Sequence, residues 1–248
     1  MSAIYVMWLR QLKRYWRSRA RMAGMLGQPI LFLLALGFGI GPIFEQAGGG
    51  NFIQFLVPGI IAMTVLFTAM FSGIEVIWDR QFGFLKETLV APVPRWKIML
   101  GKTFGGATVA LAQGFIVFII TLMIGFRPAN LAALPIALIL LFMIAMLFTA
   151  LGVAIASRLE DMQAFPLIMN FLIMPLFFLS GALFPLKGIP KILEIIIKLN
   201  PLSYGVDGLR ATLSGVSTLG LGLDFAVITI VGVIVFAFGS YQFSKIQL

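Results

Sequence analysis

Six apolar stretches follow one another along the chain, at about 26–44, 52–77, 98–126, 131–157, 163–185 and 223–243. Polar or charged breaks separate them. A helix of about 20 predominantly apolar residues is long enough to cross the hydrocarbon core of a bilayer. The pattern therefore predicts an all-α integral membrane protein with six transmembrane helices.

Composition agrees with this fold class and excludes several functions. Hydrophobic residues make up 60% of the 248 residues and charged residues 11%, whereas a soluble domain has roughly half and a quarter. The spans leave no room for a separate water-soluble domain, so residues 1–248 are expected to form one transmembrane domain. With no Cys and no His, thiol nucleophiles, His-based acid–base catalysis and Cys or His zinc sites are excluded. We expect neither an enzyme nor a metal site.

Residues 1–24 predict an amphipathic helix. At helical spacing an apolar face lies opposite a basic face: Ile4, Trp8, Leu12 and Tyr15 form the first, and Arg10, Arg14, Arg17 and Arg21 the second. A helix of this kind lies in the membrane interface, with its basic face toward anionic lipid. The alternative is a basic flank of the first span. Both interpretations place the N-terminus in the cytoplasm.

The distribution of basic residues predicts the orientation of the spans. In a chain this apolar, the net charge of +9 indicates basic loops beside anionic lipid, not a nucleic-acid partner. With the N-terminus inside, 13 of the 18 Lys and Arg residues fall in cytoplasmic segments. An even number of spans then returns the C-terminus to the cytoplasm. The expected location is the cell membrane.

Gly101-Lys102-Thr103 has the ending of a phosphate-binding loop. The full loop needs a second glycine five residues before Gly101, where this chain has Trp96. The segment also follows Pro94 and leads into an apolar stretch, so it does not join a strand to a helix. We interpret it as the entrance of a span and expect no ATP hydrolysis by this chain.

Two pairs of glycines, Gly37–Gly41 and Gly101–Gly105, have the spacing that lets helix backbones approach closely in a membrane. Glycine is common in membrane helices, so the spacing alone does not identify which helices meet.

Residues 79–90 predict a short cytoplasmic helix between the second and third spans. Pro92 and Pro94 cannot continue it. Phe82, Leu85 and Leu89 would share one face. Exposed apolar residues on a short helix favour docking into a groove of a partner protein. The alternative is a helix that lies on the lipid surface.

Residues 187–215 predict two short helices before the last span. Glu194 is placed to pair with Lys198 at i,i+4, and Asn200-Pro201 ends this first helix. A second helix around 206–213 carries Asp207. Both helices are too short to cross about 30 Å of hydrocarbon, so we expect a re-entrant hairpin on the outer side. A loop lying in the interface is the alternative.

Polar groups within the spans are few. Glu75 and Asp224 fall near the ends of spans, where water is available, and no acidic residue lies at depth. This argues against an ion-coupled transporter. Asn170 lies midway along the fifth span between Pro166 and Pro175, which predict a kink there. It either faces a transport pathway or bonds a neighbouring helix. The candidates for the pathway are Asn170, Thr68, Phe71 and Met174.

Three segments, in this order and spacing, carry a resemblance to a known family. They are FLKETLVAPVPRWKIMLGK in the first cytoplasmic loop, FPLIMNFLIMPLFFLSGALFPL at 165–186 and NPLSYGVDGLRATL at 200–213. With the basic N-terminal helix, they resemble the permease subunit of type-2 ABC exporters, in particular the daunorubicin-resistance or multidrug-export branch.

The resemblance implies a separate ATPase subunit, in two copies, that binds ATP and Mg, so this chain itself is expected to bind no cofactor. It also implies a second permease subunit, expected to make a homodimer, and export of a hydrophobic or amphipathic molecule that is drug-like or lipid-like. The implied contacts with the ATPase, centred on a coupling helix at 79–90, are Phe82, Gly83, Leu85, Lys86, Glu87, Leu89 and Arg158. The implied structural motif is Asn200, Pro201, Tyr204, Asp207 and Arg210. The alternatives are a permease for a lipid-linked polysaccharide and an ion-coupled secondary transporter.

Overall fold

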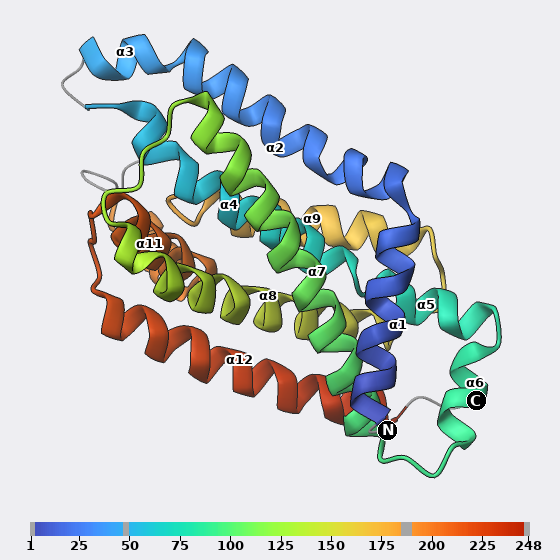
Figure 1. The fold of residues 1–248 in the computed structure, drawn as a ribbon. Coiled ribbons are helices and arrows are strands. Elements are labelled where there is room, and N and C mark those ends of the chain that lie inside the picture. The colour runs from blue at the N-terminus through green and yellow to red at the C-terminus, as the bar shows by residue number, and fades with distance from the viewer. Residues whose placement is uncertain (1–2, 47–49, 185–189, 246–248) are drawn as a thin grey trace.

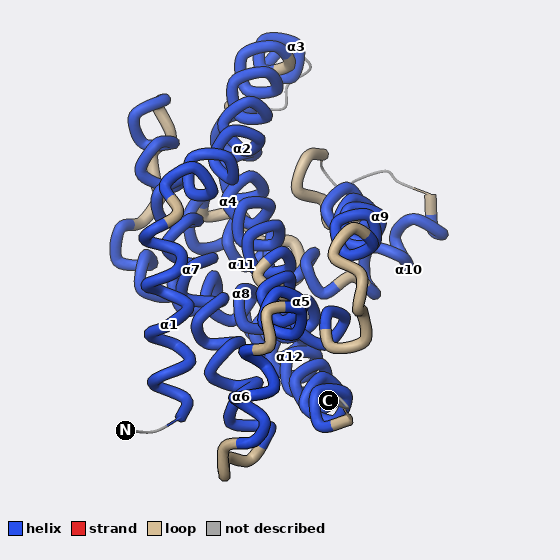
Figure 2. The backbone as a smooth tube through the Cα atoms, turned by 90° about the vertical axis from the view of Figure 1, so that its right-hand side faces the viewer, coloured by secondary structure: helices blue, strands red, loops and turns tan. Residues whose placement is uncertain are grey.

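The computed structural model describes residues 3–46, 50–184 and 190–245, and the regular elements within these ranges are all helices (Figures 1 and 2). In chain order they are α1 (Ala3–Arg17), α2 (Arg19–Gly39), α3 (Gly41–Gln46), α4 (Phe52–Phe71), α5 (Ile74–Gln81), α6 (Phe84–Val90), α7 (Arg95–Ile124), η1 (Leu131–Ala133), α8 (Leu134–Ala156), α9 (Ala164–Phe178), α10 (Lys191–Leu199), α11 (Pro201–Ser214) and α12 (Leu221–Ser244). The all-α prediction is confirmed for the described part of the chain.

Five segments of the described chain are long and apolar enough to cross a membrane. They are Met22–Gly39, Phe52–Gln81, Arg95–Ile124, Leu131–Ala156 and Leu221–Ser244. The stretch predicted as a span at 163–185 forms α9, which has 15 residues and is therefore about 22 Å long. This is shorter than the roughly 30 Å hydrocarbon core. The structure thus gives five candidate spans and one shorter apolar helix where the sequence pattern predicts six spans.

Helix α4 forms the centre of the bundle, because 15 of its 20 residues are buried. It packs against α2, α7, α8 and α11, and more lightly against α9. By contrast, α2 and α12 are exposed along most of their apolar length, as expected of helices that face lipid. The start of α1 and the end of α12 lie at the same end of the bundle as α5 and α6 (Figure 1). This end is called the N/C end below, and the opposite one the far end.

Two glycines let the α4–α5 junction touch α8. A Cβ atom at Gly73 would collide with the carbonyl oxygen of Gly152, and a Cβ atom at Gly152 would collide with the carbonyl oxygen of Met70. Both obstacles are backbone atoms, which cannot rotate away as the end of a side chain can. The second span is therefore held to the fourth by direct backbone contact.

Replacing Gly152 by Ala is expected to destabilise the bundle by about 1–3 kcal/mol, the usual cost of overpacking a filled core. The matched control is Gly232→Ala in α12, where the new Cβ would meet only the Leu147 Cβ at 3.9 Å. There the higher helix propensity of Ala should leave stability unchanged or slightly raised. Thermal unfolding in mild detergent compares the two variants, and equal midpoints would contradict the backbone contact.

The second glycine pair explains how α1 is held. A Cβ atom at Gly101 would lie 2.7 Å from the Met7 Cβ, and one at Gly105 would lie 2.5 Å from the Gln11 Cβ. Helix α1 thus docks closely on α7, and Trp8 Nε1 donates a hydrogen bond of 3.0 Å to Thr108 Oγ1. The apolar face of α1 that includes Trp8 therefore packs largely on α7.

The other glycine pair makes no comparable contact within the described chain. A Cβ atom at Gly37 would lie 3.7 Å from Ile53 Cγ1, which is ordinary van der Waals contact, and one at Gly41 would have no neighbour within 4 Å.

Two predicted helices have different bounds in the structure. The expected helix at 79–90 is interrupted at Gly83, whose φ of 76° is left-handed, so Asp79 belongs to α5 and only 84–90 form α6. In the predicted hairpin at 187–215, the second helix begins at Pro201 instead of near residue 206. The Asn200 side chain accepts a hydrogen bond from the Leu202 N–H, and Pro suits the first helical position. Residues 187–189 lie outside the described residues.

Candidate functional site at the N/C end

The carboxylate of Asp79 is the centre of an ionic cluster between α1, α5 and α7. Its side chain is only 1% exposed. Arg10 from α1 donates two hydrogen bonds to it, of 2.9 Å to Oδ2 and 2.7 Å to Oδ1. Lys102 from α7 donates a third to Oδ2. Arg14 lies at 3.5 Å from Asp79 and 3.6 Å from Glu75. Three helices distant in sequence are therefore joined through one buried carboxylate.

This geometry gives the Gly-Lys-Thr sequence its role in the fold. Lys102 is 2% exposed and paired with Asp79, and Thr103 is fully buried. Gly101 is the contact point for α1. All three residues are used in packing and ion pairing inside the bundle, and none is placed to wrap a phosphate. Removing one member of a buried ion pair costs about 3–5 kcal/mol, because its partner remains buried and unpaired.

The cluster is also connected to α6. The guanidinium carbon of Arg10 lies 3.5 Å from the centroid of the Phe84 ring, in a cation–π contact. Phe84 is the first residue of α6. Arg10 therefore contacts α5 through Asp79 and α6 through Phe84, on both sides of the Gly83 break.

The residues predicted to contact an ATPase around α6 fall into a buried group and an exposed group. Leu85 is 1% exposed and Leu89 is partly buried, so both pack on the bundle. Phe82 is 80% exposed and Val90 76%. Lys86 and Glu87 are exposed between them. The α6 surface, defined as Phe82, Lys86, Glu87 and Val90, is thus two large apolar side chains with two charges between them. Val90 was not among the residues that the sequence indicated.

The turn after α8 lies beside this region. Arg80 Nη1 donates to the Leu159 carbonyl at 3.4 Å, and Gln81 Nε2 donates to the Glu160 carbonyl at 3.3 Å. Arg158, the remaining predicted ATPase contact, is exposed and donates from Nε to Gln242 Oε1 at 2.8 Å. The structure therefore brings both predicted contact segments together at the N/C end, on either side of the end of α5.

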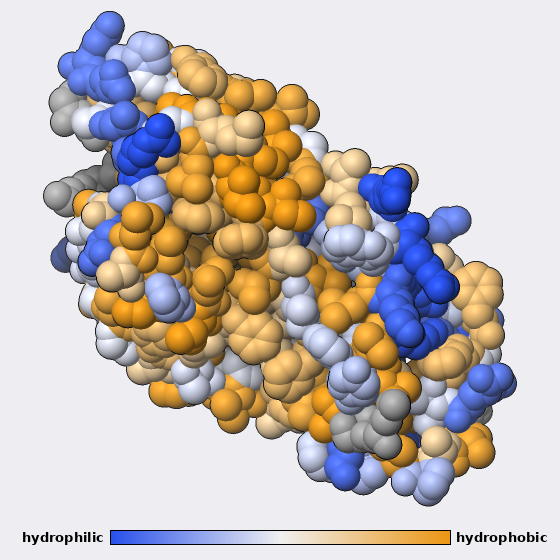
Figure 3. All heavy atoms as spheres, in the orientation of Figure 1, coloured by the Kyte–Doolittle hydropathy of each residue, from blue (hydrophilic) through white to orange (hydrophobic). Residues whose placement is uncertain are grey.

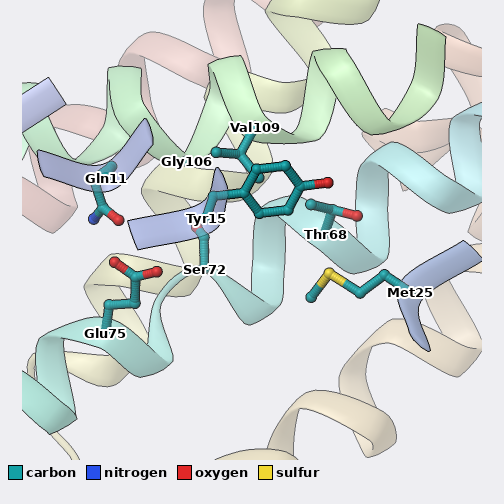
Figure 4. Close-up of a pocket in the computed structure, with 8 residues that line it drawn as sticks. All are labelled: Gln11, Tyr15, Met25, Thr68, Ser72, Glu75, Gly106 and Val109. Atoms are coloured by element: carbon teal, nitrogen blue, oxygen red, sulfur yellow. The ribbon is translucent and has the colours of Figure 1, made fainter. Parts of the chain in front are cut away.

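A small polar pocket adjoins the cluster, because Glu75, which pairs with Arg14, also lines it (Figure 4). Tyr15 from α1, Thr68 and Ser72 from the end of α4, and Glu75 from α5 line it. The Tyr15 hydroxyl donates a hydrogen bond to Gln113 Oε1 on α7. Glu75 is 5% exposed, so this acid is buried beside Arg14 and not solvated at a span end as the sequence suggests.

The predicted pathway residues do not form one site. Thr68 is buried in the polar pocket. Phe71 is partly buried where α4 meets α9, with its ring centroid 6.2 Å from that of Phe165. Asn170 and Met174 are exposed on α9. The exposed face of α9 includes Leu167, Asn170, Phe171, Met174 and Phe178.

The residues of the predicted structural motif link α11 to its neighbours. Asn200 Nδ2 donates to the carbonyls of Leu176 and Leu179, at 2.6 and 3.1 Å. Tyr204 Oη donates to the Lys198 carbonyl at 2.9 Å. Arg210 donates to the Gly181 carbonyl at 3.1 Å and its guanidinium lies 4.1 Å from the Phe55 ring centroid. These contacts attach α11 to α4, to α10 and to the turn after α9.

Asp207 organises the loop that leads into α12. Its carboxylate accepts hydrogen bonds from the N–H groups of Thr218 and Leu219, at 3.0 and 2.8 Å, and from the hydroxyls of Ser217 and Thr218. Burial acts to raise the pKa of Asp207, but these hydrogen bonds outweigh it and hold the pKa below its usual value. The charged form is therefore the one that stabilises the loop.

Asp207→Asn is expected to lower stability by about 1–3 kcal/mol at neutral pH, since the loop donors lose a charged acceptor. A depressed folded-state pKa means that the stabilisation is complete above the unfolded pKa of about 3.9 and is lost as pH falls through the lower folded value. The difference from the unsubstituted chain should hence shrink below about pH 4. Thermal unfolding at pH 7 and pH 3 measures it, with the exposed Asp161→Asn as control. A pH-independent difference would contradict the assignment.

Asp224 was expected near water at the start of the last span, but the structure buries it completely. Neither carboxylate oxygen has a hydrogen-bond partner among the described residues. Gly208 on α11 makes room for it, because a Cβ there would lie 3.3 Å from Asp224 Oδ2. Only the packing of α11 on α12 reveals this burial.

Together these features define a polytopic helical membrane protein with an ionic cluster and an exposed short helix at one end. The model of the family described as "ABC-2 type transporter" matches residues 2–214, and the chain belongs to this family. Similar proteins include "Putative transport permease ycf38" of Pyropia yezoensis, 34% identical over 84% of this chain and 72% of that protein. "Nodulation protein J" of Rhizobium leguminosarum bv. viciae is 28% identical over 88% and 84%. "Inner membrane transport permease YadH" of Escherichia coli (strain K12) is 27% identical over 92% and 89%. The family is thus one of membrane transport permeases.

Proposed function

We propose that this chain is the membrane-spanning subunit of an ATP-driven exporter, and that the α6 surface docks into a separate ATPase subunit. The observation that carries the proposal is the exposure of Phe82, just before the Gly83 break, and of Val90, at the end of α6, at 80% and 76%. Lys86 and Glu87 between them are exposed as well.

The physical argument rests on the cost of leaving such a surface in water. Burying one large apolar side chain contributes about 1.5–3 kcal/mol, so a groove that covers both would gain several kcal/mol before the costs of association. A short amphipathic helix that places apolar anchors in a groove is a common way for one protein to bind another. The separate ATPase supplies the nucleotide site that Gly101-Lys102-Thr103 does not form. Two copies of this subunit are present in the proposed exporter, and each binds ATP and Mg.

The ionic cluster provides a physical link from α6 to the spans. Arg10 holds the start of α6 through Phe84, while Asp79 on α5 is tied to α1 and α7. Helix α5 belongs to the same candidate span as the central α4. In the proposed exporter, displacement of α6 by the ATPase would therefore move α1, α5 and α7 together, and through α5 the core of the bundle.

The transport pathway is proposed to involve the exposed face of α9. This face presents Asn170 among Leu167, Phe171, Met174 and Phe178, which suits a hydrophobic or amphipathic, drug-like or lipid-like molecule. We place a second copy of the chain against this face, so that two short α9 helices enclose the pathway. In this arrangement the N/C end is cytoplasmic, α9 serves as the sixth span, and α10 with α11 forms the outer hairpin.

The proposal is tested by purifying the tagged chain from its native membrane in mild detergent and identifying every protein that accompanies it. We expect a stoichiometric partner that carries a complete phosphate-binding loop, and ATP-dependent export after both are placed in vesicles. A preparation of this chain alone that transports in response to an ion gradient would overturn the proposal.

A further inference from the structure

We infer that α1 carries a binding site for the headgroup of an anionic glycerophospholipid, formed by Lys13 and Arg17 with Arg14 at its inner edge. This inference does not depend on the proposed ATPase partner. It rests on charge, on the position of α1 relative to the first span, and on a surface groove.

The charges on α1 exceed what the acidic residues near them can neutralise. Arg10 and Arg14 turn toward Asp79 and Glu75, and Lys102 also shares Asp79. Lys13 and Arg17 are exposed, and neither has an ion-pair partner among the described residues. The four cations of α1 and Lys102 thus add up to five positive charges against the two carboxylates, which leaves an excess of three. Figure 3 shows the resulting hydrophilic patch over α1 beside the broad hydrophobic surface over α2.

The spacing of the two free cations favours an anion between them. Lys13 and Arg17 are four residues apart, so they are neighbours on one face of α1. Like charges at this spacing repel and destabilise a helix slightly. A phosphate group placed between them would attract both cations, and this attraction would outweigh their mutual repulsion.

The position of this pair is the depth of lipid headgroups. Helix α2 follows α1 after Ser18, and its membrane-spanning part begins at Met22. Arg17 is therefore only five residues before the first residue of a span. Trp16 is 76% exposed and Tyr5 45%, and aromatic rings with a polar edge gather at the membrane–water interface. This depth favours a lipid phosphate over a soluble anion.

The surface at this point is hollowed. An open groove of about 560 Å³ runs along α1, and Leu9, Lys13, Arg14 and Arg17 contribute to it together with Tyr5. Apolar atoms at one side and guanidinium and ammonium groups at the other match the glycerol and phosphate parts of one lipid molecule. About a third of the Arg14 side chain is exposed (34%), although its Nη1 atom is buried beside Glu75 and Asp79.

The test is native mass spectrometry of the purified protein titrated with phosphatidylglycerol and, separately, with phosphatidylcholine. We expect the unsubstituted chain to retain phosphatidylglycerol in preference to phosphatidylcholine. The double variant Lys13→Gln/Arg17→Gln should bind it about 10- to 30-fold more weakly, since each cation near an anionic lipid surface contributes roughly a tenfold factor or less. The conservative variant Lys13→Arg/Arg17→Lys should keep the affinity within about threefold.

The matched control is Lys97→Gln/Lys245→Gln, which removes the same charge from the N/C end without changing α1. It should bind phosphatidylglycerol within about twofold of the unsubstituted chain. Equal affinity for both lipids, or an equal loss in the control, would overturn the inference. Displacement of the lipid by inorganic phosphate at millimolar concentration would overturn the choice of a lipid and leave a soluble phosphate site instead.

Discussion

Phe82→Asp combined with Val90→Asp is expected to abolish the association of this chain with its ATPase. Both side chains are exposed in the isolated subunit, so the substitutions should leave the fold intact. In the complex, each substitution removes about 1.5–3 kcal/mol of binding free energy from apolar burial. It also places a carboxylate in a groove shaped for a hydrocarbon group. Affinity should fall at least about 100-fold. Copurification and stimulation of ATPase activity by the permease measure the effect.

The control for this experiment is Leu131→Asp/Val216→Asp, two exposed apolar residues outside the N/C end. It should leave association unchanged. Leu85 is unsuitable as a test residue, although the sequence points to it, because its side chain is buried and a charge there would damage the bundle in any case. Retained association of the Phe82/Val90 double variant, with unchanged stimulation, would show that the ATPase binds elsewhere.

Asp79→Asn is expected to cost about 3–5 kcal/mol of stability, because Arg10 and Lys102 keep their charges in a buried cluster that has lost its carboxylate. Lys102→Met should also destabilise the bundle. The double variant Asp79→Asn/Lys102→Met should lose less than the sum of the two, since no buried lysine charge is left unpaired. Thermal unfolding of the four proteins gives the coupling. Strict additivity would mean that the two residues do not interact.

The exposed pair Glu194–Lys198 is the matched control for the buried one. It has a hydrogen bond of 2.6 Å and the i,i+4 spacing, yet about half of each side chain is exposed. Surface ion pairs contribute little because water solvates both partners. Glu194→Gln should leave the unfolding midpoint unchanged, whereas Asp79→Asn should lower it.

The Asp79 variants also test the link to transport. If the cluster transmits displacement of α6 to the spans, a complex of the ATPase with the Asp79→Asn chain should transport less substrate per ATP hydrolysed. Transport and hydrolysis measured in the same vesicles give this ratio. An unchanged ratio would limit the cluster to a role in stability.

The sequence predicts a helix well wherever a stretch of apolar residues is long enough to cross a membrane. Stretches of about 20 apolar residues have few stable alternatives in lipid, because every backbone polar group must be hydrogen-bonded within the segment. This is why α7, α8 and α12 lie within three residues of their predicted ranges, and why α2 and α4 overlap theirs. The apolar stretch at 163–185 differs in helix length, because its helix α9 ends at Phe178 and a turn follows.

The candidate site was only partly predictable. The sequence locates a short helix near 79–90 and indicates that its apolar residues matter, but it groups Phe82 with Leu85 on one face. The left-handed Gly83 breaks that helix, so the two residues lie in different elements and only Leu85 is buried. Helical periodicity defines faces within a continuous helix, and it gives no information across a break.

The sequence by itself determined that this protein is an α-helical membrane protein with basic segments at its span ends and no complete nucleotide loop. These properties depend on composition and on spacing over a few residues. Only the tertiary structure decided that Lys102 pairs with Asp79, that α1 packs on α7, and that Asp224 is buried. Each of these contacts joins helices far apart in the chain. Their partners are chosen by how the helices pack, which local patterns of polar and apolar residues do not encode.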